Sequence, residues 1–344
     1  FNKMTLKTST IKIPEKIKEQ LIKKQYGIVG NHSAVQICSW SKKALKNEGV
    51  CYKEIFYDID CHRCAQMTPA VVWCQNNCIY CWRPMEFMKA LEMDPDEVDD
   101  PDLIIEETIK VRWQLLSGIK ASPKINMKKY EEARIPNHWA ISLSGEPTIY
   151  PKLDELIKKL KERPEVKSVF LVTNGQRPDV LKKLAEKDAL PVQLYISVSA
   201  PNKDVFKKVV RPVYKDGWER LNKSLELLRE LKVRRVFRLT IIKGWNDADE
   251  YFPQYAELVR KSQSDFVEIK AYMFLGYSTH RLRYSNMPTH EEIKEYAKKL
   301  LQYLPEYKYE NEAPRSRIVL LKNKNSIYPD KIDYSWKNKE AVNN

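Results

Sequence analysis

Three closely spaced cysteines constrain this chain more than any other feature. Cys74, Cys78 and Cys81 follow the spacing C-x3-C-x2-C. Thiolates are the usual ligands of iron–sulfur clusters, and three of them leave one iron of a [4Fe–4S] cube open for substrate chemistry. The simpler interpretation buries the three thiols along one face of a helix. Asn76 and Asn77 argue against a helix, because asparagine competes for backbone hydrogen bonds and favours loops.

Four further cysteines lie upstream, and the chain has none after Cys81. A disulfide framework would spread its cysteines through a secreted fold, whereas this clustering indicates metal binding in a reducing compartment. Cys38, Cys51 and Cys64 are evenly spaced and predict a second cluster with three thiolate ligands. Cys61 and Cys64 also form a C-x2-C pair, so a zinc site or a redox pair is the alternative.

The charge of the chain predicts a polyanionic partner. Its 344 residues include 60 Lys and Arg against 46 Asp and Glu, which gives a net charge of +14. Phosphates that are neutralised by Lys or Arg release counterions, so this excess favours a nucleic-acid partner. The alternative is that the lysines simply lie on the solvent-exposed faces of helices. The lysine-rich start, Phe1–Lys24, has no secretory apolar region, and no apolar run reaches the roughly 18 residues of a membrane span. We therefore expect a soluble, cytoplasmic protein without membrane contact.

From Ala70 onward the sequence pattern alternates between strands and helices. Apolar and β-branched runs predict six strands, at Ala70–Trp73, His138–Leu143, Val166–Val172, Val192–Val198, Val233–Ile242 and Phe266–Met273. Helical patterns separate them, at Leu103–Ile119, Lys152–Arg163, Pro178–Glu186, Trp218–Leu231, Ala248–Ser262 and His290–Leu304. Alternating βα units imply a parallel sheet with right-handed crossovers, and six units fit an α/β fold with an open, partial (β/α)6 TIM-like barrel.

We expect three regions along the chain. Residues 1–69 form an N-terminal cysteine-rich extension that carries the ligands of the second cluster and includes one amphipathic helix at Glu15–Gln25. Residues 70–290 form the partial barrel. Residues 291–344 contain the last helix, one or two strands within Tyr307–Leu321, and a frayed tail after Asp330. A hydrophobic content of 43% is enough for a sizeable core.

The cysteine spacing, just after a short apolar run, resembles the signature loop of the radical S-adenosylmethionine (SAM) enzymes. In that family the open iron chelates the amino and carboxylate groups of SAM, and one electron splits SAM into methionine and a 5′-deoxyadenosyl radical. The resemblance implies the partial barrel of that family, with the active site at the carboxyl ends of the strands.

Polar residues that follow the predicted strands resemble the SAM-binding positions of this family. Gly145 and Glu146 match the strand edge that meets the amino group of SAM, and Asn174 offers amide donors and acceptors to the cofactor. Ser197 and Ser199 alternate with apolar residues and point to one face of their strand, where their hydroxyls would contact the ribose or the carboxylate. Without the family, these are ordinary turn and strand positions.

A narrower resemblance covers most of the chain, from about the first cysteine through the sixth predicted strand. The segments Cys64–Pro69, Trp73–Cys74 and Cys81–Pro84, with evenly spaced cysteines upstream, resemble the archaeal tRNA 4-demethylwyosine synthases. That family carries a second [4Fe–4S] cluster, and the match implies three ligands for it: Cys38, Cys51 and Cys64. Cys61 has no role that the resemblance assigns.

The resemblance implies a tRNA-modifying lyase that acts on carbon–carbon bonds. The family converts N1-methylguanosine at position 37 of tRNA(Phe) into 4-demethylwyosine, with pyruvate as the carbon donor. The adenosyl radical takes a hydrogen from the N1-methyl group, and the resulting carbon radical attacks C2 of pyruvate. The carboxyl carbon of pyruvate is lost, and the third ring closes. No flavodoxin-like domain is evident, so we expect an external electron donor, and we expect a monomer.

Lys53 lies two residues after Cys51, at the place of the Schiff-base lysine proposed for the family. A desolvated lysine, or one beside another cation, loses its proton more easily and attacks a ketone. The resemblance thus implies that pyruvate is held on Lys53, on the second cluster or on both. By position alone, a solvated lysine is the ordinary interpretation.

An anticodon loop presents unpaired bases and phosphates that basic and aromatic residues can bind. Candidate contacts near the predicted strand ends are Arg211, Lys243, Trp245, Lys270, Arg281 and Arg283, although such residues are more often in surface ion pairs. Glu268, Lys270 and Tyr272 alternate along the sixth strand, where they line the interior or form an internal ion-pair network.

Two other functions fit parts of the sequence. One is a radical SAM enzyme with an auxiliary cluster that acts on a peptide or a small molecule. The other is a noncatalytic cluster or zinc protein that binds RNA. The positive charge favours a tRNA substrate over the first function. The βα alternation, together with Gly145, Glu146 and Asn174, disfavours the second.

Overall fold

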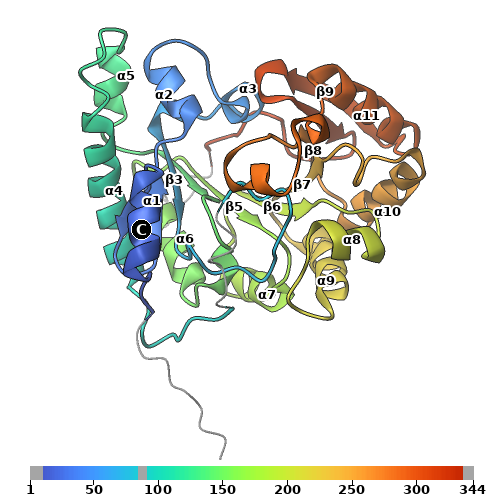
Figure 1. Ribbon diagram of the computed structural model, residues 1–344, viewed down its shortest axis with the longest axis horizontal. Helices are drawn as coiled ribbons and strands as arrows, with labels where there is room; N and C mark the ends of the chain where they lie inside the picture. Colours follow the sequence, from blue (N-terminus) through green and yellow to red (C-terminus); the bar gives the residue numbers. More distant parts are fainter. Residues whose placement is uncertain (1–10, 84–90, 336–344) are drawn as a thin grey trace, which may run out of the picture.

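One ten-stranded sheet organises the computed structural model, which describes residues 11–83 and 91–335 (Figure 1). Neighbouring strands run in the order β1 (Gly27–Val29), β2 (Ser33–Gln36), β3 (Cys64–Thr68), β4 (His138–Ile141), β5 (Ser168–Thr173), β6 (Gln193–Val198), β7 (Arg234–Ile241), β8 (Phe266–Ala271), β10 (Ile318–Asn323) and β9 (Tyr307–Ala313). The strands from β3 to β8 are parallel and follow the chain order. Antiparallel pairs extend the sheet at both edges.

Helices cover the outer face of the parallel strands (Figure 1). The crossover helices are α4 (Pro101–Ser117), α6 (Leu153–Glu162), α7 (Pro178–Glu186), α9 (Gly217–Glu230) and α10 (Phe252–Ser262), and α11 (His290–Gln302) follows β8. The shorter helices are α1 (Glu15–Lys23), α2 (Ser39–Leu45), α3 (Tyr52–Tyr57), α5 (Met127–Glu132) and α8 (Lys203–Val209). This arrangement confirms the partial (β/α)6 barrel. Among residues 11–83 and 91–335, no helix is both long and apolar enough to cross a membrane.

Most predicted elements are confirmed, with ends that shift by a few residues, but the first predicted strand is wrong. The strand lies at Cys64–Thr68 and not at Ala70–Trp73. Thr68 Oγ1 donates to Ser144 O over 2.6 Å and accepts from Ala70 N over 3.1 Å. The Thr68 hydroxyl therefore ends the strand, and Pro69, which has no N–H to donate, begins the loop. The apolar residues after Pro69 are buried in that loop.

The C-terminal segment predicted to be frayed after Asp330 instead contacts the barrel as far as it is described. Ile332 N donates to Tyr57 O over 3.1 Å, and the Tyr334 hydroxyl donates to Asp58 O over 2.8 Å. Residues 336–344 of the predicted tail lie outside the described residues. The prediction failed because single polar and aromatic residues in a terminus give no periodic pattern from which docking could be read.

The short helix α3 lies inside the barrel, which the sequence did not predict. The Tyr57 ring packs edge-on against Phe170 of β5 and Phe266 of β8, with centroid distances of 6.0 and 5.7 Å. At the other end of α3, Lys270 Nζ lies 5.0 Å from the centroid of the Tyr52 ring. Phe266 begins β8 and Lys270 lies near its end, so α3 runs antiparallel to the strands. Its first turn therefore faces their carboxyl ends.

Arg112 provides a test of how the cysteine-rich region is fixed to the barrel. This buried side chain of α4 donates from Nε to Cys64 O (3.0 Å), from Nη2 to His62 O (2.9 Å) and from Nη1 to Ala133 O. Arg112→Ala should lower the free energy of unfolding by about 3 kcal/mol, because buried carbonyls lose their donors. Lys110→Ala, at an exposed position of the same helix, should change it by less than about 0.5 kcal/mol. Anaerobic urea unfolding measures both, and equal midpoints for the two variants would contradict this account.

Candidate functional site

The first cysteine group, Cys74, Cys78 and Cys81, lies in the loop after β3. Two neighbouring segments hold the backbone of this loop. Ile79 N donates to Val209 O, at the end of α8, over 2.9 Å. Arg281, in the segment after β8, donates from Nε to Ile79 O over 3.1 Å and from Nη2 to Cys81 O. The side chain of Arg281, a predicted RNA contact, therefore supports the cysteine loop.

The electrostatics of the first cysteine group fit a cationic cluster. Burial raises the pKa of Cys78 to about 12, and negative charge on Cys81 adds to the shift. Burial also raises the pKa of Cys74 well above its ordinary value, and Cys78 adds to it. Thiols with raised pKa values ionise together only beside positive charge, which iron would supply. In the described ranges, no three His, Cys, Asp or Glu side chains are grouped for a single metal ion, so the fit rests on the type and spacing of the thiols.

Gly145 and Glu146 connect the end of β4 to this loop. Gly145 has a φ of 66°, and a Cβ at this position would overlap the carbonyl oxygen of Ala70, so only glycine fits. Glu146 N donates to Trp73 O over 2.7 Å. Burial raises the pKa of the Glu146 carboxyl, and four hydrogen bonds oppose the shift. Their donors are Thr148 N, Thr148 Oγ1, Thr173 Oγ1 and Asn174 N, at 2.7 to 3.1 Å.

Asn174 lies between Glu146 and the first cysteine group. Its backbone N–H donates to the Glu146 carboxylate, and its Nδ2 lies 3.7 Å from Cys74 Sγ and 3.3 Å from Gln75 Oε1. The strand ends of β4 and β5 thus meet at Cys74. The Glu146 carboxylate already accepts four hydrogen bonds from the chain, and Asn174 Oδ1 accepts one from Gln176 N over 3.0 Å. A ligand here would therefore use the remaining capacity of the Asn174 amide and the nearby backbone.

Ser197 lies in β6, and Ser199 directly follows the end of that strand. The Ser199 hydroxyl donates to the Tyr80 hydroxyl over 2.8 Å, which connects β6 to the cysteine loop. Ser197 is partly buried and pairs in register with Arg238 of β7. Tyr195 precedes them on the same face.

The second cysteine group, Cys38, Cys51 and Cys64, comes together from three elements. Cys38 precedes α2, Cys51 precedes α3, and Cys64 begins β3. Burial raises the pKa of Cys51 to about 11 and that of Cys64 to about 12, and negative charge on Cys38 raises both further. Each thiol therefore lies within electrostatic reach of the others. This set also fits a cationic iron–sulfur cluster.

Cys61 differs from the three thiols of the second group. Its Sγ accepts a hydrogen bond from Cys51 N over 3.4 Å, and its own N–H donates to the Glu54 carboxylate over 3.0 Å. The side chain is almost fully buried, and burial raises its pKa strongly. Cys61 acts here as a buried thiol that orders the start of α3.

Lys53 is buried in the interior beside the second cysteine group. Its Nζ lies 5.1 Å from the centroid of the Phe170 ring and 5.4 Å from that of Tyr195. Within the described part of the chain, this nitrogen has no hydrogen-bond or ion-pair partner. Burial lowers the pKa of Lys53, and the positive charge of Arg238 lowers it further. The arrangement favours a neutral amine, which is a nucleophile.

Sequence reasoning missed several polar residues around Lys53. Arg238 donates to the Glu268 carboxylate over 2.9 Å and to the Tyr52 hydroxyl over 2.5 Å. His138 Nδ1 is 2.6 Å from Ser168 Oγ, while its buried Nε2 has no partner among the described residues. The sequence did contain one signal for this site, namely an arginine and a histidine at inward positions of β7 and β4. Charged residues are rarely buried without a function or a partner.

The predicted RNA contacts fall into different environments. Lys243 pairs with Glu292 over 2.5 Å, and Lys270 points into the interior, where burial and Arg238 lower its pKa to about 8. Arg211 and Arg283 are exposed, and Trp245 is 36% exposed. These three stay available to a partner. Of the two alternatives for the sixth strand, Glu268 takes part in an internal ion pair, with Arg238, and Lys270 faces the interior. The Tyr272 hydroxyl bonds to Ser278 Oγ over 2.9 Å.

Comparisons with known protein families divide the chain into two matched regions. Residues 68–255 match the radical SAM superfamily, and residues 261–323 match the family described as wyosine base formation. The radical SAM match accounts for a SAM cofactor and one [4Fe–4S] cluster.

Several relatives and solved structures are similar over nearly the whole chain. The S-adenosyl-L-methionine-dependent tRNA 4-demethylwyosine synthase of Pyrococcus abyssi is 47% identical over 90% of this chain and 89% of its own length. That of Methanocaldococcus jannaschii is 38% identical over 91% and 97%. The solved structure of TYW1 with a lysine-pyruvate adduct bound is 36% identical, covers 93% of this chain and 99% of its own, and has a TM-score of 0.82. The chain therefore belongs to the tRNA 4-demethylwyosine synthase family of the radical SAM superfamily.

Proposed function

We propose that this protein condenses N1-methylguanosine-37 of tRNA(Phe) with pyruvate to form 4-demethylwyosine, as a SAM-dependent carbon–carbon lyase. The observation that carries the proposal is Lys53, a buried lysine without a polar partner in the described ranges, beside the second cysteine group. The lysine-pyruvate adduct of a similar solved structure supports the keto acid, and the names of the relatives support the tRNA.

Two [4Fe–4S] clusters and SAM are the proposed cofactors. The first cysteine group would hold one cluster and the second group the other. SAM would be bound by five residues at the strand ends: Gly145, Glu146, Asn174, Ser197 and Ser199. When bound, the first cluster and SAM supply one-electron, hydrogen-abstracting chemistry. The Glu146 carboxylate contributes by fixing Asn174 and Thr173, so that the Asn174 amide faces the cofactor.

Lys53 is the proposed catalytic residue. Its neutral amine attacks the C2 carbonyl of pyruvate, and loss of water gives an imine that holds the keto acid in the barrel. The rings of Phe170 and Tyr195 exclude water from the nitrogen. The positive charge of Arg238 opposes protonation of Lys53. These contacts support a nucleophilic role for Lys53 rather than a role as a surface cation.

The proposed partners follow from the reaction. The net charge of +14 supports binding of the tRNA anticodon loop. We further propose that a separate protein or reductant supplies the electron, and that the enzyme acts as a cytoplasmic monomer.

An anaerobic assay tests the proposed function. Reconstituted protein is incubated with SAM, dithionite, pyruvate and tRNA that carries N1-methylguanosine, and the digested nucleosides are analysed by mass spectrometry. We expect 5′-deoxyadenosine together with a tricyclic nucleoside. Formation of 5′-deoxyadenosine without the tricyclic product would remove this tRNA and keto acid from the reaction.

Cysteine variants test which thiols hold iron. Reconstituted wild-type protein should contain about eight iron atoms per chain, and Cys78→Ala or Cys51→Ala should contain about four, because each loses one cluster ligand. Cys61→Ala is the matched control and should keep about eight, since Cys61 only orders α3. Iron is measured by elemental analysis. A loss of iron in Cys61→Ala equal to that in Cys51→Ala would contradict the ligand assignment.

Reductive trapping tests the role of Lys53. Cyanoborohydride should convert the imine into a stable adduct, and peptide mass spectrometry should locate it on Lys53 and not on Lys270. The yield should rise with pH through a midpoint below 10.5, because burial lowers the pKa of Lys53 from that value and only the neutral amine reacts. Lys53→Ala should abolish trapping, whereas Lys270→Ala should retain the adduct on Lys53. An adduct on Lys270, or a midpoint at or above 10.5, would be inconsistent with this mechanism.

A further inference from the structure

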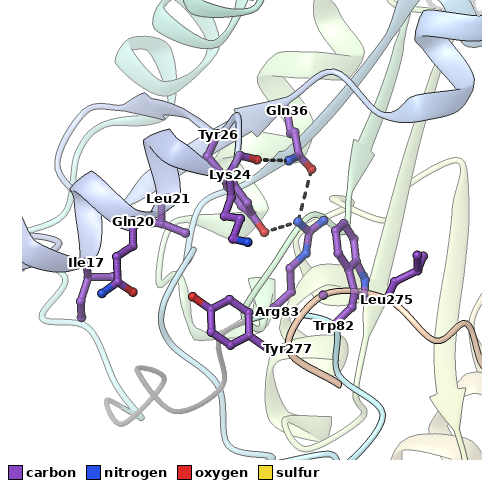
Figure 2. Close-up of a pocket in the computed structure, with 11 residues that line it drawn as sticks. Ile17, Gln20, Leu21, Lys24, Tyr26, Gln36, Trp82, Arg83, Leu275 and Tyr277 are labelled. Atoms are coloured by element: carbon purple, nitrogen blue, oxygen red, sulfur yellow. Dashed lines mark hydrogen bonds between the residues drawn. The ribbon is translucent and has the colours of Figure 1, made fainter. Parts of the chain in front are cut away.

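A cavity of about 280 Å³ is lined in part by Trp82 and Arg83, the two residues that follow Cys81 (Figure 2). Its other walls come from α1, from the segment after it, from the end of β2 and from the segment after β8. The volume is near the lower end of small-ligand sites, roughly 300 to 1,000 Å³. The residues that carry its chemistry are Lys24, Tyr26, Gln36, Trp82, Arg83 and Tyr277.

Arg83 is the unusual residue of this cavity, because it is a buried cation with unused donors. The residue is 3% exposed, and Nη1 donates to the Tyr26 hydroxyl and to Gln36 Oε1, the latter over 3.3 Å (Figure 2). Among the described residues, Arg83 has no carboxylate partner, and its Nε and Nη2 have no hydrogen-bond partner. A buried charge without a counterion is costly, so an anion that binds both donors would be stabilised.

Aromatic rings stand next to this cation. The Arg83 guanidinium lies 3.1 Å from the centroid of the Trp82 ring, and Trp82 remains 44% exposed. Lys24 Nζ lies 5.8 Å from the centroid of the Tyr277 ring. Tyr277 N donates to Trp82 O over 3.1 Å, which fixes the two aromatic residues relative to each other. Cations interleaved with accessible rings are the usual means of binding unpaired nucleotides.

We propose that this cavity binds one unpaired nucleotide of the RNA substrate. The base stacks on Trp82 and Tyr277, and the phosphate accepts from Nε and Nη2 of Arg83, with Lys24 as a second cation. The inference rests on the proposed tRNA substrate and names the part of this chain that holds it. The position two residues after Cys81 brings the bound RNA to the loop of the first cysteine group.

Binding of an anticodon stem-loop RNA, labelled with fluorescein and carrying N1-methylguanosine, tests the cavity directly. The reconstituted protein is titrated under anaerobic conditions at several salt concentrations. Tyr277→Ala should weaken binding by at least about fivefold, because one stacking ring is lost, and Tyr277→Phe should restore it. Lys24→Ala should lower the slope of log Kd against log salt by about one, because one phosphate contact is lost.

Matched variants and a crosslinking measurement separate binding from folding. Tyr303→Ala and Lys110→Ala remove an exposed ring and an exposed cation outside the cavity, and both should leave RNA affinity unchanged. Iron content and the midpoint of urea unfolding are measured for every variant. Ultraviolet crosslinking of wild-type protein to the RNA should attach a nucleotide to a peptide that contains Trp82 or Tyr277.

Three results would overturn the proposal. One is an RNA affinity that is the same for Tyr277→Ala, Lys24→Ala and wild-type protein. Another is crosslinking confined to peptides outside the cavity. The third is that Tyr277→Ala and Lys24→Ala bind RNA like the wild-type protein but have clusters that a flavodoxin reduces more slowly. That result would assign the cavity to the electron donor. None of the three depends on turnover, so they are distinguishable from failure of the proposed reaction, in which RNA binds but no tricyclic nucleoside forms.

Discussion

The ion pair between Arg238 and Glu268 holds α3 inside the barrel, and the interior site depends on that placement. Glu268 accepts from Arg238 over 2.9 Å and from the Tyr57 hydroxyl over 2.8 Å, and Arg238 also donates to Tyr52. The Glu268 side chain is fully buried and that of Arg238 is 16% exposed, and Glu268 raises the pKa of Arg238 against the effect of burial. Buried ion pairs add little net stability to a fold, so the main effect of this pair is to fix the position of the elements that it joins. Here the pair fixes both ends of α3, and with them the lysine in its first turn.

Strand β6 connects the two cysteine groups. Tyr195 contacts Lys53, which lies beside the second group, and Ser199 contacts Tyr80 in the loop of the first group. Tyr195 and Ser199 are four residues apart, which is roughly 13 Å along an extended strand, so the same stretch of chain contacts the surroundings of both groups. Ser197 lies between them, opposite Arg238. An amine at one end and a radical-generating cofactor at the other would enclose the reacting atoms between them.

The sequence was sufficient for the features with strong local signals. The cysteine spacing gave the first group, and the alternation of apolar runs gave the parallel strands from β4 to β8. The first strand was misplaced because the residues after Pro69 are as apolar as a strand, and only the contacts of Thr68 show where β3 ends. The insertion of α3 had no local signal, since six residues carry too little periodicity. Arg83 lies within the motif segment Cys81–Pro84, but its unused donors depend on burial that distant segments create.

The central claim is that two thiolate-bound clusters share one interior across β6. Electron paramagnetic resonance of the fully reduced protein tests it most directly, because two paramagnetic centres that share one interior broaden each other's signals by dipolar coupling. The account predicts a broadened spectrum in the wild-type protein that sharpens to one isolated centre in either Cys78→Ala or Cys51→Ala. A spectrum of a single isolated cluster in the wild-type protein, at full iron loading, would contradict it.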